Sequence, residues 1–365
     1  MDVHWFLPTR GDSRDVGPAT TDRGHNAAAL KRRPTLDYLG AVAGAAEQAG
    51  FTAVLTPTGS GCEDAWVTCA ALLDRTQTLH FLVAFRPGFI LPTLAAQQAA
   101  SFQRLSGGRL RLNVVTGGDP VEQRAYGDFL DHDARYARTG EFLDVLRRCL
   151  AGERFDVDGE HLQAVGTGLS NPPDVVPPVY LGGASTAAED VSARYVDTYL
   201  TWGEPPTMVR ERLDRVRQKA ADRGRTIRFG IRLHVVSRDT PELAWAEADR
   251  MLAGMPASAI AATQERFARM DSVGQARMAS LHRGSAGDGA RSLEVAPNLW
   301  AGIGLVREGA ATALVGSHEQ VAERITEYAE LGFDEFVLSG YPHLEEAWRV
   351  GEEVLPLLDR TRSAA

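Results

Sequence analysis

Short hydrophobic runs of strand length alternate with segments of helical periodicity along the whole chain. The runs begin near residues 3, 52, 79, 110, 179, 198, 229 and 335, and a helix-period segment follows each of them. Unbroken hydrophobic runs are typical of strands that a parallel sheet buries on both faces. Eight such units predict an α/β fold of the (β/α)8 TIM-barrel type, which needs about 250 residues before insertions.

Most of the additional length lies between the seventh and eighth predicted strands. The pattern there predicts helices near Pro241–Leu252 and Ser258–Ala279, and then a glycine-rich segment, Arg283–Ser292. That segment is either a disordered surface loop or a lid over the barrel mouth, where long loops usually serve the active site. We expect one domain over residues 1–365, with an insertion or lid at about 253–310.

Two local predictions concern other parts of the chain. Phe155–Leu162 reads as a hairpin, because Asp158-Gly159 supplies a turn. Cys62–Leu73 reads as a helix, which places the Cys62 thiol where a helix dipole would lower its pKa. A buried, inert cysteine is the commoner alternative.

Charge and hydropathy exclude several classes of partner. The 365 residues contain 39 Lys and Arg against 48 Asp and Glu, a net charge of −9, and no basic block accompanies aromatic residues. Nucleic acid is therefore not an expected partner. No run approaches the roughly 20 apolar residues that span a bilayer, so no membrane association is expected.

The cysteines indicate the compartment. Cys62, Cys69 and Cys149 form no CxxC pair, which favours reduced thiols in a cytoplasm over a disulfide framework or a cysteine zinc site. The N-terminal residues show no basic region followed by a long apolar one, so we expect no export signal. We predict a cytoplasmic protein.

The carboxyl ends of the predicted strands are rich in glycine, hydroxyl groups and cations. Arg232 and His234 are two apart in one strand, so their side chains leave the same face. A guanidinium binds multi-oxygen anions and an imidazole handles protons near neutral pH. The alternative is an Arg232 paired with a carboxylate and a His234 hydrogen-bonded in the barrel wall.

Further chemistry is suggested by Gly182-Gly183-Ala184-Ser185, which opens a helix directly after a strand. Exposed backbone N–H groups at such a point can bind phosphate, although an ordinary strand-to-helix turn has the same pattern. There is no GxGxxG, Walker or Gly-x-Ser-x-Gly motif. The nine histidines form neither HxH nor HExxH, so we expect no metal.

Several longer motifs together carry a family resemblance. They include WFLPT at 5–9, CEDAW at 62–66, NVVTGGD at 113–119, YLTWGEPP at 199–206, IRFGIRLHV at 227–235, PNLWAG at 297–302 and LSGYPHLEE at 338–346. The chain resembles the bacterial-luciferase-like, flavin-dependent alkanesulfonate monooxygenases over nearly its whole length. This resemblance implies a (β/α)8 barrel that uses reduced FMN, supplied by a separate NAD(P)H-dependent FMN reductase, together with O2. The implied products are an aldehyde, sulfite, water and oxidised FMN.

The resemblance also implies residue roles, position by position. It places Arg232, His234, Tyr341 and Arg307 in catalysis. It places Trp202, Arg10, Arg232, Arg307 and Tyr341 at the substrate. It places Cys62, Asn113, Thr116, Tyr136, Gly183, Ala184 and Ser185 at the cofactor, the last four around its phosphate. It further implies a homodimer or homotetramer.

The chain departs from the family pattern near the predicted entrance. Arg10 stands where these enzymes usually have His, and Ser60-Gly61 stands where they have Arg-Ser. Added positive charge there favours a polar, hydroxyl-bearing sulfonate, so we expect sulfoquinovose, with 6-dehydroglucose as the aldehyde. Neutral drift is the alternative, with a linear alkanesulfonate or methanesulfonate as substrate.

Two other function classes stay open. One is a deazaflavin-dependent oxidoreductase of the same superfamily, which would transfer hydride without oxygen. The other is a flavin- or sulfonate-binding protein with no activity, although the presence of His234, Tyr341 and both arginines argues against it.

Overall fold

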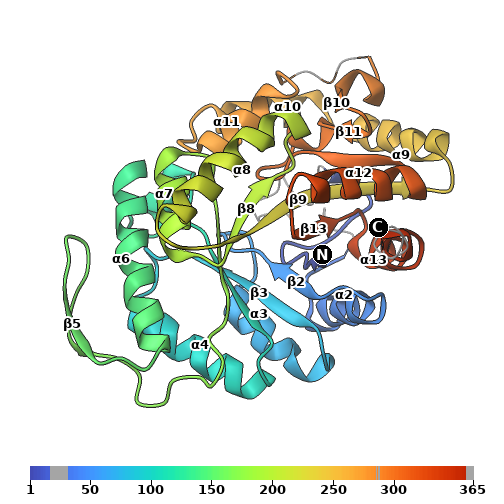
Figure 1. The fold of residues 1–365 in the computed structure, drawn as a ribbon. Coiled ribbons are helices and arrows are strands. Elements are labelled where there is room, and N and C mark those ends of the chain that lie inside the picture. The colour runs from blue at the N-terminus through green and yellow to red at the C-terminus, as the bar shows by residue number, and fades with distance from the viewer. Residues whose placement is uncertain (17–31, 285, 287, 359–365) are drawn as a thin grey trace.

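The fold is a closed barrel of eight parallel strands surrounded by helices (Figure 1). A computed structural model describes residues 1–16, 32–284, 286 and 288–358. The barrel strands are β1(Asp2–Phe6), β2(Ala53–Thr56), β3(His80–Phe85), β4(Leu110–Val114), β7(Val179–Gly182), β8(Thr198–Trp202), β9(Arg228–Arg238) and β13(Glu335–Ser339). Pairing of β9 with both β8 and β13 closes the ring. The predicted fold class and all eight predicted strands are confirmed.

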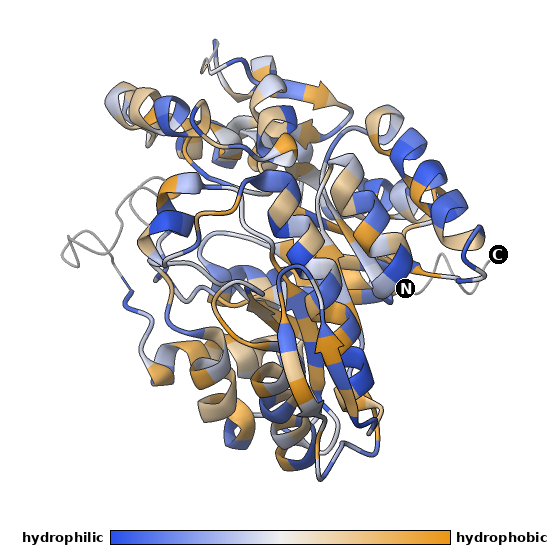
Figure 2. Cartoon of the chain, turned by 90° about the vertical axis from the view of Figure 1, so that its left-hand side faces the viewer, coloured by the Kyte–Doolittle hydropathy of each residue, from blue (hydrophilic) through white to orange (hydrophobic). Residues whose placement is uncertain are grey.

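Helices follow the strands and cover the outside of the barrel (Figure 1). They are α2(Leu36–Gln48), α3(Ala65–Leu72), α4(Pro92–Ser106), α6(His132–Leu150), α7(Thr186–Tyr195), α8(Pro206–Ala221), α12(His318–Glu330) and α13(His343–Arg349). Short helical turns extend two of them, η1(Leu73–Arg75) and η4(Val350–Val354). Hydrophobic and hydrophilic residues alternate along these helices, as one buried face requires (Figure 2).

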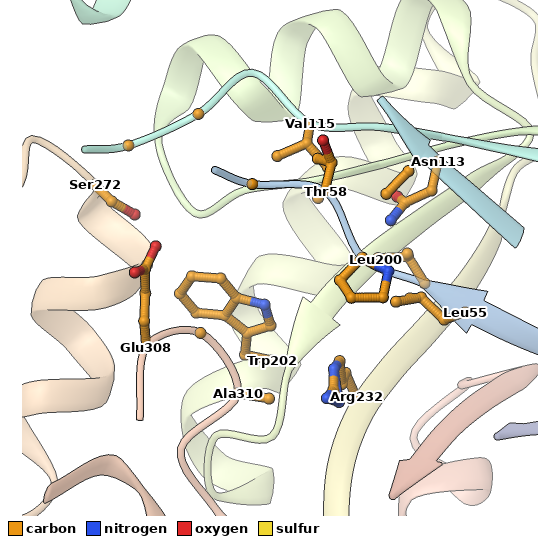
Figure 3. A pocket seen from close by; sticks show the side chains of 18 of the residues that line it. Leu55, Thr58, Asn113, Val115, Leu200, Trp202, Arg232, Ser272, Glu308 and Ala310 are labelled. Atoms are coloured by element: carbon orange, nitrogen blue, oxygen red, sulfur yellow. The ribbon is translucent and has the colours of Figure 1, made fainter. Parts of the chain in front are cut away.

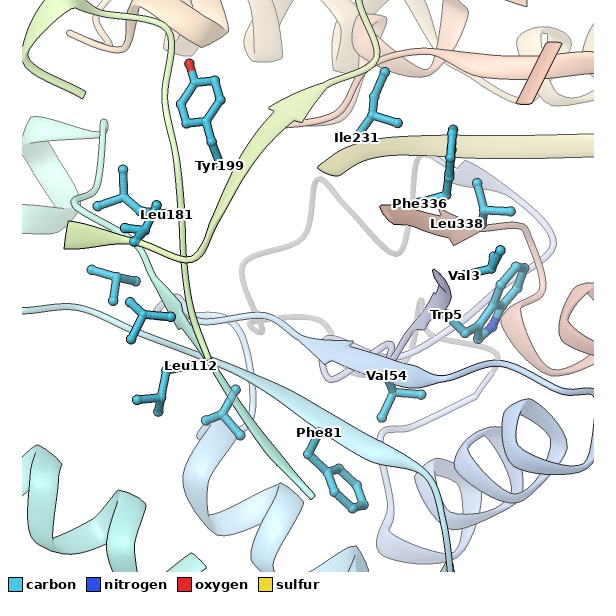
Figure 4. Close-up of a cluster of buried hydrophobic side chains, with 14 of the residues drawn as sticks. Val3, Trp5, Val54, Phe81, Leu112, Leu181, Tyr199, Ile231, Phe336 and Leu338 are labelled. Atoms are coloured by element: carbon cyan, nitrogen blue, oxygen red, sulfur yellow. The ribbon is translucent and has the colours of Figure 1, made fainter. Parts of the chain in front are cut away.

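Strand residues alternate between two hydrophobic layers. Outward-facing side chains such as Trp5, Phe81 and Phe336 are fully buried against the helices (Figure 4). Inward-facing side chains form a smaller layer inside the barrel: Phe6, Leu55, Leu82, Tyr180, Leu200 and Val337. This inner layer fills the barrel, so a ligand can enter only at its carboxyl end.

A buried polar cluster lies on the other side of the inner layer. The Glu335 carboxylate, with no exposed surface, accepts hydrogen bonds from Tyr180 (2.8 Å) and Thr198 (3.2 Å). It also pairs with His4 at 2.9 Å and with Arg228 at 2.9 Å. Although burial alone would raise the pKa of Glu335, these partners lower it to about 2.

The insertion between β9 and α12 contains strands that the sequence analysis missed. Its elements are α9(Pro241–Ala253), α10(Ala257–Phe267), α11(Val273–Ser280), η2(Ala290–Leu293), β10(Glu294–Ala296), β11(Leu299–Trp300), η3(Gly302–Leu305) and β12(Ala313–Ser317). The second half of β9 leaves the barrel and pairs with β12. On its other edge β12 pairs with β11, and β11 pairs with β10, so these strands extend the sheet beyond the barrel. The segment predicted as a loop or lid, Arg283–Ser292, lies partly outside the described residues, at 285 and 287.

Three local predictions need correction. The helix predicted over Ser258–Ala279 is divided, because the Ser272 side chain accepts the Gln275 backbone N–H and starts α11 there. The predicted hairpin exists, but its strands are β5(Phe155–Asp158) and β6(Gln163–Thr167), so it extends beyond Leu162. Glu141 accepts the backbone N–H groups of residues 160–162 and thereby supports a four-residue turn.

The predicted helix start at Cys62 is the third correction. Asp64 caps α3 by accepting the Val67 backbone N–H at 2.9 Å, so the helix begins at Ala65. Cys62 therefore precedes the helix, and the argument from a helix dipole does not apply to its thiol. A further short helix, α5(Pro120–Ala125), had not been predicted.

Candidate active site

A cavity of about 320 Å³ opens at the carboxyl ends of the barrel strands. Phe6, Leu55 and Leu200 of the inner hydrophobic layer form its floor. Arg232 and Trp202, which are neighbours across β9 and β8, point into it (Figure 3). The cavity therefore combines a flat hydrophobic surface with a cation.

Arg232 is a buried cation that forms no ion pair within the described part of the chain. Its side chain is 8% exposed, and Nη1 and Nη2 have no hydrogen-bond partner among the described residues. Its guanidinium lies 4.2 Å from the centroid of the Phe6 ring, and that of Arg307 lies 5.2 Å from the same centroid. Burial, together with the charge of Arg307, lowers the pKa of Arg232 to about 9. Two guanidinium groups on one ring constitute a site for an anion.

Tyr341 belongs to the same corner of the cavity. Arg307 Nη1 donates a hydrogen bond to Tyr341 Oη, which leaves the phenol O–H free to donate to a ligand. The Tyr341 ring stacks on the His234 ring, with centroids 5.6 Å apart and an interplanar angle of 16°. Arg307, Tyr341 and Arg232 all line the cavity, as predicted.

His234 does not line the cavity, which differs from the prediction that it contacts the ligand. It is 1% exposed and lies behind Tyr341. Nε2 is 3.1 Å from the Ala310 carbonyl oxygen, which can only accept, and Nδ1 is 2.8 Å from Ser339 Oγ. Burial and two neighbouring arginines hold the pKa of His234 well below its usual value. His234 is thus a neutral residue that positions Tyr341 and the backbone at Ala310.

The predicted phosphate-binding residues form a close-fitting turn. Gly183 and Ala184 line the cavity together with Tyr136. A Cβ on Gly183 would lie 2.6 Å from Tyr136 Oη, and the φ of Gly183 is +155°, so only glycine fits. Ser185 is outside the lining and caps α7 by accepting the Ala188 N–H at 3.2 Å.

This turn is chemically suited to a phosphate. Gly183 and Ala184 come just before the amino end of α7, where backbone N–H groups and the helix dipole favour an anion. The Tyr136 hydroxyl stands over the same turn, and burial raises its pKa, so it stays a hydrogen-bond donor. The donors fit the phosphate of a flavin mononucleotide, and the hydrophobic floor fits a planar ring.

Three predicted cofactor residues and two predicted substrate residues also line the cavity: Asn113, Thr116, Cys62, Trp202 and Arg10. Arg10 lies over a glycine turn, with its Nε 3.3 Å from the place of a Cβ on Gly61. Burial alone would lower the pKa of Arg10. The neighbouring side chains of Cys62, Glu308 and Glu122 outweigh this effect and raise the pKa. Glycine at position 61 thus provides the space that Arg10 occupies.

Several lining residues had not been predicted. The buried pair Arg86–Glu122 (2.5 Å) forms part of one wall. His343 lines the cavity and is held by Asp12, whose Oδ1 is 2.9 Å from His343 Nδ1. The position of Arg86 at a strand end was visible in the sequence. The contact between Asp12 and His343 was not, because 331 positions separate them.

The insertion contributes the outer wall of the cavity through Met270, Ser272 and Gly274. The ion pairs that attach it to the rest of the fold include two beside this wall. Arg135 Nη2 lies 2.7 Å from Asp271, and Arg277 Nη2 lies 2.6 Å from the buried Glu204. These contacts keep the insertion over the barrel mouth.

Within the described ranges, no group of His, Cys, Asp and Glu side chains is arranged to hold a metal ion. Nor does any helix there have the length and hydrophobicity needed to cross a bilayer.

Solved structures of similar fold cover nearly the whole chain. A riboflavin lyase, RcaE, solved with modified FMN and riboflavin, has a TM-score of 0.78 at 21% identity and covers 100% of this chain and 92% of its own. A long-chain alkane monooxygenase, LadA, has a TM-score of 0.76 at 17% identity, covering 99% and 92%. EDTA monooxygenase EmoA from Chelativorans sp. BNC1 has a TM-score of 0.74 at 21% identity, covering 99% and 94%.

The family profile described as luciferase-like monooxygenase matches residues 1–335, which is most of the chain. The barrel, the cavity at its carboxyl end and this match agree. The chain belongs to the luciferase-like monooxygenase family and is an enzyme of that class, which acts with O2.

Proposed function

We propose that this enzyme uses reduced FMN and O2 to cleave the carbon–sulfur bond of an organosulfonate, giving an aldehyde and sulfite. The observation that carries the proposal is the unpaired guanidinium of Arg232 beside Arg307, on the hydrophobic floor of the cavity. A buried cation without a carboxylate partner calls for an anionic ligand. A sulfonate has the charge and the three oxygens that two guanidinium groups can share.

FMN is supported by the Gly183 turn, by the hydrophobic floor and by the FMN named for the structurally similar riboflavin lyase. Gly183, Ala184 and Tyr136 would hold its phosphate, and Asn113 and Thr116 would lie beside its ring. When bound, reduced FMN supplies the activation of O2. It would arrive from a separate NAD(P)H-dependent FMN reductase, and the chain would assemble as a homodimer or homotetramer.

The protein's own part in the reaction is to bind charge and exclude water. Arg232 and Arg307 hold the sulfonate, and the Tyr341 O–H donates to one of its oxygens. When the carbon–sulfur bond breaks, the charge on the sulfur group grows from one to two, so the same cations bind the leaving sulfite more strongly than the substrate. The insertion residues Met270 and Ser272 shield this step from solvent.

Within this class we favour sulfoquinovose over methanesulfonate and linear alkanesulfonates. Arg10 adds a further guanidinium to the cavity that contains Arg232 and Arg307, and its donors suit the hydroxyl groups of a sugar. The deciding experiment is a sulfite-release panel with reduced FMN, O2, sulfoquinovose, methanesulfonate and longer sulfonates. We expect the highest kcat/KM with sulfoquinovose.

The other outcomes of the sulfite-release panel would test the substrate preference and the reaction class separately. Equal rates with all sulfonates would remove the preference for the sugar but keep the reaction class. Absence of sulfite from every sulfonate would refute the proposal. Hydride exchange with a deazaflavin in the absence of oxygen would then identify the alternative class.

A further inference from the structure

We propose that Asp12 and His343 form a proton-accepting dyad in the cavity wall, which takes the proton released when sulfite leaves the substrate carbon. This inference rests on the proposed function and adds a step to it. His343 lines the cavity, and its buried Nε2 atom has no hydrogen-bond partner among the described residues.

The dyad is held by three parts of the fold. Asp12, which follows β1, is fully buried, and its Oδ1 lies 2.9 Å from Nδ1 of His343, the first residue of α13. Asp12 Oδ2 accepts the His343 backbone N–H at 2.7 Å and a hydrogen bond from Tyr38 of α2. Although burial alone would raise the pKa of Asp12, His343 and Tyr38 lower it. Since Oδ2 already accepts hydrogen bonds from Tyr38 and the His343 backbone, Asp12 acts as the acceptor of the pair, and His343 donates to Oδ1 from Nδ1.

This arrangement leaves Nε2 of His343 as the reactive atom. The side chain is 2% exposed, and Nε2 has no hydrogen-bond partner among the residues that the structure describes. An imidazole that donates from Nδ1 to a carboxylate presents a basic lone pair at Nε2. His234 differs in this respect, because both of its ring nitrogens are engaged by the protein.

The His343 ring lies beside the proposed sulfonate site. The His343 ring centroid lies 5.0 Å from that of Tyr341 and 5.6 Å from that of Phe6. Phe6 is the ring on which Arg232 and Arg307 lie. The base and the two cations therefore share one corner of the cavity, so a substrate held by its sulfonate would present its neighbouring carbon to His343.

The chemistry needs a base at that place. Transfer of one oxygen atom of O2 to the carbon that bears the sulfonate gives a hydroxysulfonate, R–CH(OH)–SO3⁻. The second oxygen atom of O2 is reduced to water. In its breakdown the O–H bond breaks, a C=O bond forms, and the electron pair of the C–S bond leaves on sulfur as sulfite. This breakdown of the hydroxysulfonate consumes no external oxidant or reductant. The proton passes to His343 Nε2, and Asp12 stabilises the imidazolium.

This step can be tested without flavin. Hydroxymethanesulfonate, the adduct of formaldehyde and bisulfite, is the simplest hydroxysulfonate, and the purified protein alone should accelerate its release of sulfite over the rate in buffer. His343→Gln should reduce kcat about 100-fold with KM changed less than about threefold. Asp12→Asn should reduce kcat at least about tenfold, because the imidazolium loses its partner.

The matched control is His318→Gln. His318 is also buried and also pairs with a carboxylate, Asp239 at 3.2 Å, but it does not line the cavity. This variant should release sulfite at the wild-type rate. In His343→Ala, added imidazole should restore part of the lost rate, which a purely structural role would not allow.

Two results would overturn the inference: a wild-type protein no faster than buffer, or a folded His343→Gln variant as fast as wild type. If His343→Gln fails to fold by circular dichroism, a folded Asp12→Asn variant with the wild-type rate has the same force. The proposed function fails separately, when the complete system with reduced FMN and O2 releases no sulfite from any sulfonate.

Discussion

The guanidinium of Arg232 lies 4.2 Å from the centroid of the Phe6 ring, and no carboxylate among the described residues pairs with it. A ring face compensates only part of the cost of burying a cation, by about 0.5–2 kcal/mol. The folded protein therefore holds a charge that it would be more stable without. Such an arrangement is expected where binding an anion outweighs the loss of stability.

The first prediction follows because Arg232 lowers the stability of the fold but is needed to bind the anion. Arg232→Met should raise the free energy of unfolding by about 1–3 kcal/mol, because it removes an unpaired buried charge but keeps most of the volume. The same variant should lose sulfite release at least about 100-fold. Urea denaturation and the sulfite assay measure the two effects on one preparation.

Arg228→Met is the matched control for this prediction. Arg228 lies on the same strand but pairs with Glu335 (2.9 Å) and Asp2 (3.0 Å), so its loss should destabilise the fold. If Arg232→Met were as destabilising as Arg228→Met, Arg232 would have a structural partner and the argument for an anion site would fail.

The second prediction concerns the turn at Gly183, which we propose binds the FMN phosphate. Gly183→Ala should weaken FMN binding at least about tenfold, because the new Cβ would lie 2.6 Å from both Tyr136 Oη and the Ala188 Cβ. Quenching of FMN fluorescence on titration with protein gives the Kd. Gly166→Ala, also at positive φ (+60°) but with no atom within 4 Å, should leave this Kd unchanged. Normal FMN affinity in Gly183→Ala would place the phosphate elsewhere.

The barrel could be predicted from the sequence because each of its strands is a hydrophobic run of its own. The strands that extend the sheet beyond the barrel, β10, β11 and β12, could not be predicted in this way. β12 is five residues long and pairs with the part of β9 that extends beyond the barrel. It can form only because β9 continues past the barrel and offers an edge for pairing. Only the three-dimensional path of the chain contains that information.

In the cavity, too, features set by local sequence could be predicted, and features set by contacts between distant segments could not. Arg232 and Trp202 could be predicted because residues at strand ends line the mouth of any such barrel. The engagement of His234 by Ser339 and Ala310, and the pairing of Asp12 with His343, are contacts between distant segments. Spacing in one strand indicated the correct face for His234 but not which groups already occupy its ring nitrogens.

The third prediction tests how the insertion is attached. Asp271→Asn should leave the buried Arg135 without its counter-charge and loosen the insertion over the cavity. Residues 257–280 should then exchange their amide hydrogens faster, and KM for the sulfonate should rise severalfold. Glu265→Gln, which breaks an exposed pair with Arg269, should change neither measurement. Unchanged exchange in Asp271→Asn would show that other contacts hold the insertion.

The last prediction is a pH dependence of stability that originates at the closed end of the barrel. The partners of Glu335 lower its pKa to about 2, so the unfolded chain binds this proton more readily than the folded one. The resulting stability, up to about 3 kcal/mol, is complete above the unfolded pKa of about 4.5 and is lost as the pH falls toward 2. Burial also lowers the pKa of His4, which adds to the loss below about pH 6.5. Urea midpoints between pH 7 and pH 3 should therefore fall steeply for wild type and for Glu352→Gln, an exposed control. Glu335→Gln should be less stable at pH 7 and show a shallower slope, and an unchanged slope would place the acid sensitivity elsewhere.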